Sequence, residues 1–348
     1  MIFFCAALLL ITPAELLPGQ TAHTKNPNLE RYEFTSPLMG TLFRITLYAE
    51  HEKTARIAAD SAFQIAERLN AVFSDYDPKS ELSRLSATAG SGKAVPVSGP
   101  LFEVLTIAQK ISIESEGAFD ITAGPYTRLW RESIRGLRAE IPEENELREL
   151  ARSVGYRNLK LYTAEQTAQL LVSGMKLDPG GIAKGYTADQ MMNFLNSIGF
   201  HQVLIDAGGD VVLGEAPPGS NGWRIIIPAH DKAGKEIKLE YELENVAITN
   251  SGDLYQYIEQ DGIRYSHIID PRTGTGVPQR TSVTVVGNKG VLVDALATTL
   301  NILSADDGMA LIDHRDGYHA RIEIHDHQMV KIYQTSWFDK HNNTEPEH

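Results

Sequence analysis

Apolar residues recur every three to four positions in several long segments, which predicts amphipathic helices. Residues 54–73 carry alanines and larger aliphatic residues at this spacing, and residues 101–114 and 291–303 follow the same period. A further helical pattern comes after a glycine-rich stretch and ends near Ile198, where Gly199 is placed to stop it. Residues 131–150 are charged, and we expect them to be helical and to face solvent.

Other segments have the alternation and the β-branched residues that are typical of strands. We expect two strands within residues 32–49, on either side of Pro37–Thr41, and two strand pieces within residues 203–213, joined at Gly208–Gly209. Residues 257–267 are expected to form a hairpin that turns at Asp261–Gly262. Further strands are expected at 170–172, 175–177, 223–228, 239–243, 247–253, 282–286, 319–324 and 329–333.

The length and the charge limit the classes of function. A chain of 348 residues can form one large domain or two intimately packed ones. Its composition, with 42% hydrophobic and 22% charged residues, is that of an ordinary soluble protein. The net charge of -13 argues against a surface for nucleic acid or anionic lipid, because such surfaces need clustered Lys and Arg. A phosphate ligand would therefore be held locally, by backbone amides, a lysine or a metal.

The N-terminal residues suggest export. Residues 2–11 form an apolar run about half as long as a membrane-spanning helix, and they fit the core of a signal peptide although no basic residue precedes them. Cys5 is the only cysteine, so disulfides and cysteine-ligated zinc are excluded from the rest of the chain. We expect a periplasmic or membrane-associated protein, with residues 1–22 as signal or anchor, 23–30 as linker, 31–337 as one domain and 338–348 as a disordered tail.

Residues 177–189 are the first candidate for chemistry. Gly180, Gly181 and Gly185 lie between an apolar run and a helical pattern, and they permit close approach of a ligand to the backbone. The N–H groups that open a helix attract phosphate oxygens, Lys184 adds a positive charge and Asp178 can accept a hydrogen bond. The alternative interpretation is a tight turn with a surface lysine.

A second candidate lies within the helix predicted for residues 291–303. Asp294 and Thr298 are four residues apart and therefore share one face. A carboxylate and a hydroxyl in this arrangement form part of an oxygen ligand set for a hard cation such as Mg²⁺. The alternative is an ordinary helix with a buried threonine and an exposed acid.

Several motifs, taken in their order along the chain, resemble those of the ApbE family of FAD:protein FMN transferases. The resemblance extends from residue 39 to residue 298, and Pro179 is a departure, because the family more often has an aliphatic residue there. The matching motifs are Met39–Thr41, Phe73–Asp77 with Ser80–Leu82, Gly117–Thr122, Leu177–Asp178 with Gly180–Asp189, Asp206–Asp210, Ser251–Asp253, His267–Gly274 and Asp294–Thr298.

The resemblance implies an α+β fold with mixed and antiparallel sheets packed with helices, and an FAD cleft between two subdivisions of one domain. It also implies Mg²⁺-dependent transfer of the FMN half of FAD to a threonine, or sometimes serine, hydroxyl of a partner protein, with release of AMP. The acceptor would be a subunit of a membrane or periplasmic redox complex with an Asp-x-x-Ser/Thr-Gly-Ala-Thr-like site.

Family roles carry over to individual positions of this sequence. Gly181, through its carbonyl oxygen, Asp294 and Thr298 would bind Mg²⁺, and Lys184 would act in catalysis. His267 is the expected proton-transfer group, although Asp253 and Asp270 are alternative bases and a structural role for His267 is also open. The residues expected to bind FAD are Met39, Tyr76, Ala118, Phe119, Asp120, Asp178, Lys184, Ser251, His267 and Ile269.

Two other functions remain open at the level of the sequence. A hydrolase of the same architecture would split FAD into FMN and AMP, with water in place of the threonine. A flavin-binding protein without chemistry would not need a metal at the pyrophosphate, so Asp294 and Thr298 argue against it. Tyr76 favours transfer over hydrolysis, because an aromatic ring packed on the ligand excludes water.

Overall fold

The computed structural model describes residues 10–11, 28–138, 140–252, 257–260, 262–326 and 329–341. Most of the expected signal segment and all of residues 23–27 lie outside these ranges, as does Asp253. Within the described ranges, no helix is both long enough and apolar enough to cross a membrane. The expectation of export therefore stays a prediction.

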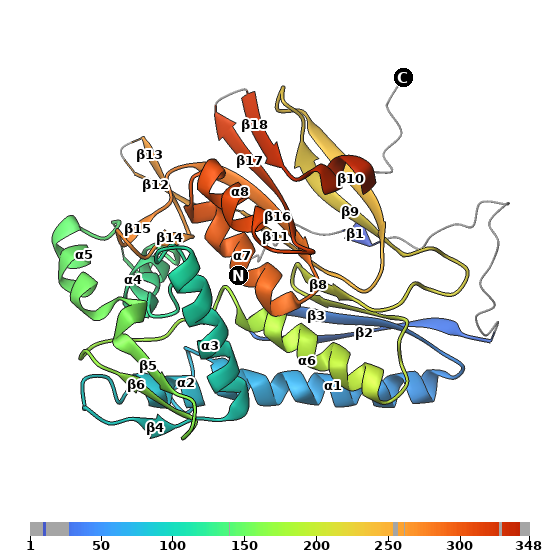
Figure 1. Cartoon of the computed structure of the whole chain (residues 1–348), viewed down its shortest axis with the longest axis horizontal. Coiled ribbons are helices and arrows are strands. Elements are labelled where there is room, and N and C mark those ends of the chain that lie inside the picture. The colour runs from blue at the N-terminus through green and yellow to red at the C-terminus, as the bar shows by residue number, and fades with distance from the viewer. Residues whose placement is uncertain are drawn as a thin grey trace.

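An antiparallel sheet of eight strands forms the centre of the molecule (Figure 1). The hairpin expected within residues 32–49 is present, with Pro37 opposite Leu42, and Asp206 pairs with Val211 across the predicted Gly208–Gly209 bend. In spatial order the strands are β18 (Met329–Gln334), β17 (His319–Asp326), β16 (Arg280–Gly287), β11 (Ala247–Gly252), β8 (Asp210–Leu213), β7 (Val203–Ala207), β3 (Thr41–Ala49) and β2 (Glu30–Leu38).

Three helices cover one face of this sheet: α1 (Glu52–Phe73), α6 (Ala183–Ser197) and α7 (Gly290–Ile302). Their apolar stripes share one core with Phe43, Ile45 and Leu47 of β3, which are fully buried. Helices α6 and α7 cross so closely that a β-carbon at Gly185 would collide with the carbonyl oxygen of Gly290. The small residues at this crossing bring the starts of the two helices together.

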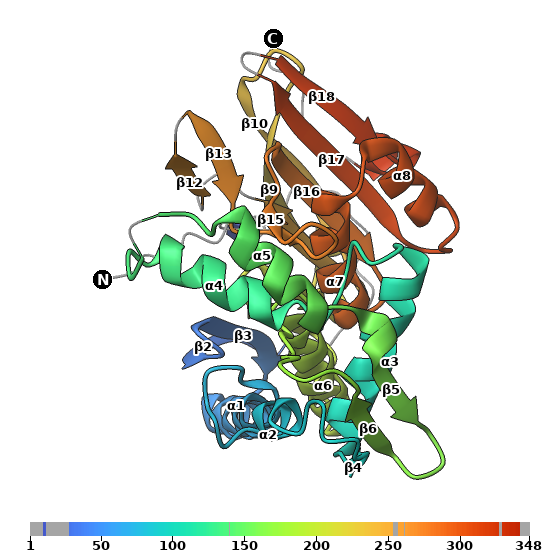
Figure 2. The same cartoon turned by 90° about the vertical axis from the view of Figure 1, so that its left-hand side faces the viewer.

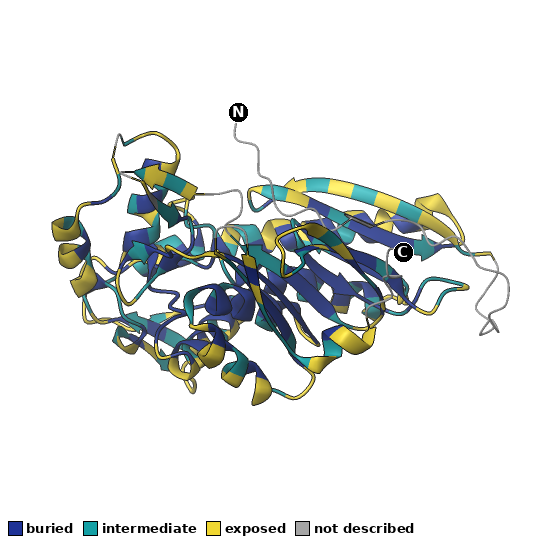
Figure 3. Cartoon of the chain, turned by 90° about the horizontal axis from the view of Figure 1, so that it is seen from above, coloured by how far each residue is buried: buried dark blue, intermediate teal, exposed yellow. Residues whose placement is uncertain are grey.

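The opposite face of the sheet is covered by β9 (Trp223–His230), β10 (Glu236–Leu243) and the short helix α9 (Ser336–His341). The short strand β1 (Leu10–Ile11) extends this smaller sheet, in the order β1-β9-β10. Val203 and Ile205 contact the helices, whereas Leu204 between them contacts the β9–β10 layer. Since both faces of the central strands are covered, the apolar residues 203–205 and 211–213 are buried, and the middle of the sheet is largely buried (Figure 3).

A second subdivision lies beside the sheet and has its own apolar core. Figure 2 shows α4 and α5 between the small hairpins and the layer of α1 and α2. The elements of this subdivision are α2 (Glu81–Ser86), α3 (Gly99–Glu114), α4 (Gly124–Ile134), α5 (Glu144–Leu150), two short 3-10 turns at Ala151–Ser153 and Tyr156–Asn158, and a small sheet of β4 (Val95–Pro96), β6 (Thr167–Leu170) and β5 (Leu159–Tyr162).

Two short hairpins stand next to α4. The first, β12 (Tyr257–Gln260) with β13 (Ile263–Ser266), is the one expected in residues 257–267, and the second is β14 (Ile269–Asp270) with β15 (Thr275–Gly276). The protein is therefore α+β, with antiparallel sheets and two packed subdivisions, as expected.

Three expectations were wrong in detail. The strand expected near residue 171 ends at Leu170, and residues 175–177 make only an isolated bridge, because Gly174 turns the chain with a positive φ of 84°. The disordered tail does not begin at residue 338, since Phe338 is buried in α9; residues 342–348 lie outside the described ranges. The sequence analysis also missed α8 (Ala305–Asp313), which the hydroxyl of Ser304 caps.

Candidate active site

The glycine-rich segment passes from the second subdivision to the central helices. It starts at Asp178, whose N–H donates to the carbonyl of Ile121 at 2.8 Å, and whose Oδ1 accepts from the N–H of Gly180 at 2.9 Å. The N–H groups of Ile182 and Ala183 donate to the carbonyl of Pro179, which forms the turn that opens α6. Pro179 therefore suits this position, because the first turn of α6 uses its carbonyl and needs no N–H from it.

Lys184, on the first turn of α6, lies between two buried carboxylates. Its Nζ makes a short ion pair with Oδ2 of Asp210 on β8 and lies 3.9 Å from Oδ1 of Asp294 on α7. Thr249 of β11 donates to the other oxygen of Asp210 at 2.7 Å, and the N–H of Gly185 donates to Asp294 at 3.0 Å. Residues of α6, α7, β8 and β11 thus meet around Lys184. This arrangement rules out the alternative of a surface lysine on a tight turn.

This arrangement perturbs the ionisation of its members. Burial alone would lower the pKa of Lys184, but the carboxylates of Asp210 and Asp294 raise it above its usual value. Burial and the neighbouring charge of Asp210 raise the pKa of Asp294 to about 7, although Lys184 opposes this rise. Lys184 is therefore a permanent cation here, whereas the ionised form of Asp294 would be stabilised by an additional positive charge beside it.

Gly181 and Thr298 complete the oxygen set predicted around Asp294. A β-carbon at Gly181 would lie 2.6 Å from Oγ1 of Thr298, so the hydroxyl faces the backbone of the glycine-rich turn. Asp294 is 3% exposed, contrary to the alternative of an exposed acid. Mg²⁺ prefers oxygen ligands such as a carbonyl, a hydroxyl and a carboxylate. Gly181, Thr298 and Asp294 supply these three, and the negative charge of Asp294 is only partly balanced by Lys184, so the residues fit such an ion.

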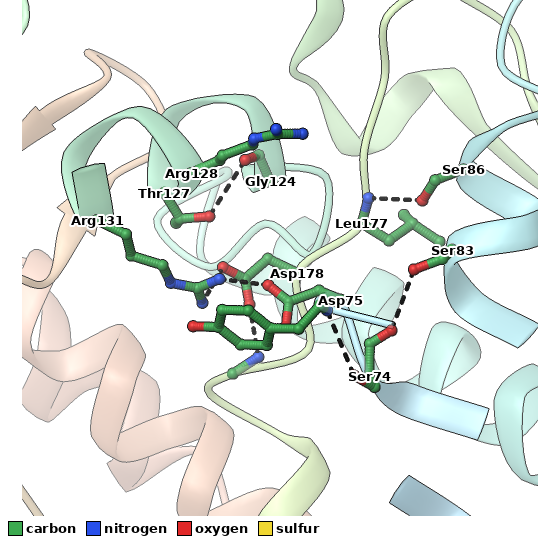
Figure 4. A network of polar contacts seen from close by, with 12 residues as sticks. Ser74, Asp75, Ser83, Ser86, Gly124, Thr127, Arg128, Arg131, Leu177 and Asp178 are labelled. Atoms are coloured by element: carbon green, nitrogen blue, oxygen red, sulfur yellow. Dashed lines mark hydrogen bonds and ion pairs between the residues drawn. The ribbon is translucent and has the colours of Figure 1, made fainter. Parts of the chain in front are cut away.

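A second polar cluster lies at the other end of the segment (Figure 4). Arg131 of α4 donates to Oδ2 of Asp178 at 2.7 Å and makes a short bond to Oδ2 of Asp75. Burial and the nearby Asp178 raise the pKa of Asp75, against the effect of Arg131. For Arg131, burial would lower the pKa, but Asp178 and Asp75 raise it. One guanidinium therefore fixes two acidic loops relative to each other.

Tyr76 follows Asp75 and places an aromatic ring beside this cluster. The ring is flanked by the guanidinium groups of Arg131 and Arg135, each 5.2 Å from its centroid, and the Tyr76 hydroxyl accepts from Arg135 at 3.0 Å. Tyr76 is 61% exposed. Its ring is held in place but remains accessible to a ligand.

The Gly117–Thr122 loop is packed inside the protein. Ala118 and Phe119 are buried, and the carboxylate of Asp120 accepts from Thr122 through one oxygen and from the N–H of Tyr156, at 2.7 Å, through the other. Burial raises the pKa of Asp120, although these hydrogen bonds counteract the rise. Asp120 thus shapes the loop directly, and a contact of these three residues with FAD stays a prediction.

The other predicted residues lie on strands and turns around the same region. Met39 forms the β2–β3 turn with a positive φ of 49°, and its sulfur lies 3.5 Å from the hydroxyl of Thr187 on α6. Ser251 is on β11, and Ile269 is buried on β14. His267 is half-buried in the bend between β13 and β14. Their roles toward FAD, and the role of His267 as a base, stay predictions.

The turn after Ile269 is anchored to α4. Asp270 accepts from the backbone N–H and the guanidinium of Arg272, and its carbonyl accepts from the N–H of Gly274 at 2.8 Å. The indole of Trp130 donates to the carbonyl of Gly274, also at 2.8 Å. Since the carboxylate of Asp270 already holds Arg272, it is a less suitable general base than the sequence alone suggested.

Comparison with known proteins agrees with this architecture and these motifs. The model of the ApbE family matches residues 39–322, which is most of the chain. The chain belongs to the ApbE family. It is 30% identical over 289 residues to a FAD:protein FMN transferase of Vibrio cholerae, covering 82% of this chain and 85% of that protein. It is also 30% identical over 309 residues to a FAD:protein FMN transferase of Treponema pallidum, covering 84% of each.

Solved structures of ApbE proteins share the fold. The flavin transferase ApbE of Vibrio cholerae superposes with a TM-score of 0.80 at 28% identity, covering 90% of this chain and 99% of that one. The apo flavinyl transferase ApbE of Pseudomonas stutzeri gives a TM-score of 0.81 at 25% identity, covering 91% and 98%. The ApbE fold therefore accounts for nearly the whole of this chain.

Two functional residues of this ApbE site were missed by the sequence analysis. Asp210 lies in the quoted Asp206–Asp210 motif but received no role, and only its pairing with Lys184 reveals one. Arg131 was placed in a charged segment facing solvent, whereas its contacts are with residues distant in sequence.

 The Arg131 side chain is in fact only 29% exposed, and its partners Asp75 and Asp178 lie 56 and 47 residues away along the chain. Contacts over such separations leave no periodic signal in the sequence.

Proposed function

We propose that this protein transfers the FMN moiety of FAD to a threonine or serine hydroxyl of an acceptor protein and releases AMP. The observation that carries the proposal is the convergence of Lys184, Asp210 and Asp294 at the start of α6, directly after the glycine-rich turn. The chain shares the ApbE fold, and its relatives from Vibrio cholerae and Treponema pallidum are named FAD:protein FMN transferases.

The chemistry requires stabilisation of negative charge. The acceptor oxygen forms a bond to the phosphorus on the FMN side of the pyrophosphate, the bond from this phosphorus to the bridging oxygen breaks, and AMP leaves with that oxygen. Negative charge is spread over the phosphoryl oxygens during this exchange. Lys184 supports the proposal because it is a fixed cation at the N-terminus of a helix, where the backbone also favours anions.

A divalent cation fits the same corner of the site. Asp294, Thr298 and the carbonyl of Gly181 would hold Mg²⁺, which would neutralise phosphate charge when bound. The buried Asp294 supports this assignment, since its pKa of about 7 reflects a carboxylate that lacks sufficient positive charge around it. Asp210 has a different role in this proposal: it holds Lys184 in position through their ion pair.

The remaining residues would position the flavin and the nucleophile. The accessible ring of Tyr76 would pack on the ligand and exclude water, while Arg131 fixes the loop that carries it. His267 would accept the proton of the acceptor hydroxyl, a contribution of about 10² to 10⁴-fold in rate. The acceptor would be an exported redox subunit with an Asp-x-x-Ser/Thr-Gly-Ala-Thr-like site.

The direct test is intact-mass analysis of such an acceptor domain after incubation with the protein, FAD and Mg²⁺, with FMN and AMP followed in parallel. We expect an FMN-sized adduct on the acceptor threonine that depends on the metal and is lost in Asp294→Ala, while this variant retains some affinity for FAD. Free FMN and AMP without an adduct would instead indicate a hydrolase. Unchanged turnover in Asp294→Ala would remove the metal assignment.

A further inference from the structure

A cluster of two histidines and a glutamate lies outside the site described above. His230 is the last residue of β9, and Glu323 and His325 lie on β17. The two β17 residues are two positions apart, so they share one face of the strand. Because β9 and β17 belong to different sheets, the cluster joins the β9–β10 layer to the large sheet.

The ligand atoms of this cluster are close enough to share one ion. Nδ1 of His230 lies 3.1 Å from Oε2 of Glu323, and Nε2 of His325 lies 3.7 Å from the same oxygen. All three atoms lie within 4.8 Å of one another. Tetrahedral Zn²⁺ with bonds of about 2.0 to 2.2 Å separates its ligand atoms by roughly 3.3 to 3.6 Å. Only small side-chain adjustments would therefore close the three ligands on an ion.

The carboxylate is already oriented for such a role. Oε1 of Glu323 accepts from Nε of Arg321 at 3.0 Å, and the N–H of His230 is shared between Oε1 at 3.1 Å and Oε2 at 3.2 Å. Arg321 also donates to the carbonyl of His230 at 3.0 Å. These bonds fix the orientation of the Glu323 carboxylate, as outer partners do in metal sites, and its Oε2 faces both imidazoles.

One of the imidazole nitrogens is buried without a partner. The His325 side chain is 8% exposed, and its Nε2 has no hydrogen-bond partner among the residues that the structure describes. A buried polar atom in this state is costly, and a bond to a metal would satisfy it. The His325 ring packs edge-on against His230 with centroids 4.5 Å apart, so its nitrogen is already directed by packing.

The donor set determines the class of ion. Two imidazoles and one carboxylate suit Zn²⁺ and similar transition metals, whereas Mg²⁺ and Ca²⁺ prefer oxygen ligands. Three protein ligands leave one tetrahedral position for water or an external group.

We propose that His230, Glu323 and His325 form a Zn²⁺ site that fastens the β9–β10 layer to the edge region of the large sheet. This site is separate from the proposed flavin site, since it uses none of the residues around Lys184. Its role is to stabilise the contact between the two sheets. His230 lies 95 residues before His325 in the sequence, so no local spacing of ligand residues indicates this site.

Zinc binding to the full chain, first stripped of metal with a chelator, tests the proposal. We expect one equivalent of Zn²⁺ to bind by calorimetry and to raise Tm, in the absence of FAD and with Mg²⁺ present in excess. His325→Phe keeps the ring packing but removes a ligand, and should weaken Zn²⁺ binding by at least the roughly 10- to 100-fold that loss of an outer partner costs. Its Tm without metal should stay close to that of the unmodified protein.

Matched variants separate this site from others. His51→Gln changes an exposed histidine without a capping bond at the start of α1 and should bind Zn²⁺ normally, as should Asp294→Ala at the proposed flavin site. Glu323→Gln should weaken binding as His325→Phe does. The proposal is overturned if no equivalent of Zn²⁺ binds, or if the His325→Phe and Glu323→Gln variants bind it as the unmodified protein does.

Discussion

Gly181 faces Thr298 so closely that a β-carbon added to the glycine would lie 2.6 Å from the threonine hydroxyl oxygen. The first residue belongs to the turn before α6 and the second to α7, so this contact joins the glycine-rich segment to the helix that carries Asp294. The absence of a side chain at residue 181 therefore keeps three oxygen donors in one place.

Gly181→Ala should disrupt the proposed metal site. The added methyl group must displace Thr298 or the turn itself, and we expect transfer activity to fall by at least about tenfold, with a higher Mg²⁺ requirement, because small misplacements at a reaction centre are costly. Gly99→Ala is the matched control, since a β-carbon there meets nothing within 4 Å. Rates measured across a Mg²⁺ titration would contradict the assignment if the two variants behaved alike.

Lys184→Met should affect stability and activity together. Without the ammonium, Asp210 and Asp294 remain as two buried carboxylates, and we expect the free energy of unfolding to fall by about 2 to 3 kcal/mol. The double variant Lys184→Met/Asp210→Asn should regain part of this stability but no transfer activity. Denaturant unfolding and the adduct assay separate the two effects; a double variant that recovered activity would show that Lys184 only balances charge.

The sequence was sufficient to predict most of the architecture, because local patterns report burial directly. Strands β2 and β3, the β7–β8 bend and helix α7 all follow from periodicity and turn residues. The end of the chain was harder to predict. Helix α9 is only six residues long, and it depends on the burial of Phe338 against the β9–β10 layer. Local propensity does not report such tertiary packing.

The candidate site was predicted only in part, for a related physical reason. Gly181, Lys184, Asp294 and Thr298 lie in two short motifs, and their chemistry can be recognised from residue type and helical spacing. Arg131 acts through partners in two distant loops, which no local pattern indicates. Short motifs thus indicate residues of the candidate site, whereas the residues that hold them in place emerge only from the folded structure.

Arg131→Ala should weaken FAD binding. The guanidinium fixes the loops of Asp75 and Asp178 and flanks the ring of Tyr76, so its loss frees the proposed flavin contacts. Hydrogen bonds to charged groups imply a rise in Kd for FAD of roughly tenfold to a hundredfold. Arg128→Ala removes an exposed arginine of the same helix as a control. Fluorescence titration with FAD would contradict this role if both variants bound FAD equally well.

Asp189→Asn should change the pH dependence of stability. Asp189 accepts from the N–H groups of Gly290 and Val291 at the start of α7, yet burial raises its pKa from 3.8 to about 6. Between these values the folded protein binds the proton more tightly than the unfolded chain, so this group's stabilising contribution is lost as the pH rises from about 4 to 6.

The asparagine does not titrate, so the variant should gain stability relative to the unmodified protein across this window. The relative gain should reach at most about 3 kcal/mol, since each pKa unit corresponds to about 1.4 kcal/mol. Urea unfolding at several pH values measures it, with Asp60→Asn on the exposed face of α1 as control. A difference between Asp189→Asn and the unmodified protein that stayed constant with pH would refute the assignment.

Trp130→Phe should slow transfer by loosening the turn next to His267. The indole donates to the carbonyl of Gly274 at 2.8 Å, and the side chain is 1% exposed, so the change leaves a buried carbonyl without its donor and a small cavity. We expect a loss of about 1 to 3 kcal/mol in the free energy of unfolding.

Trp223→Phe is a close match, because its indole donates to the carbonyl of Glu215 at 3.0 Å in the β9–β10 layer, and it should cost similar stability. Only Trp130→Phe should also lower kcat for transfer, because only its turn follows His267. Equal kcat values at a temperature where both variants are fully folded would show that the Asp270–Gly274 turn does not position the reacting groups.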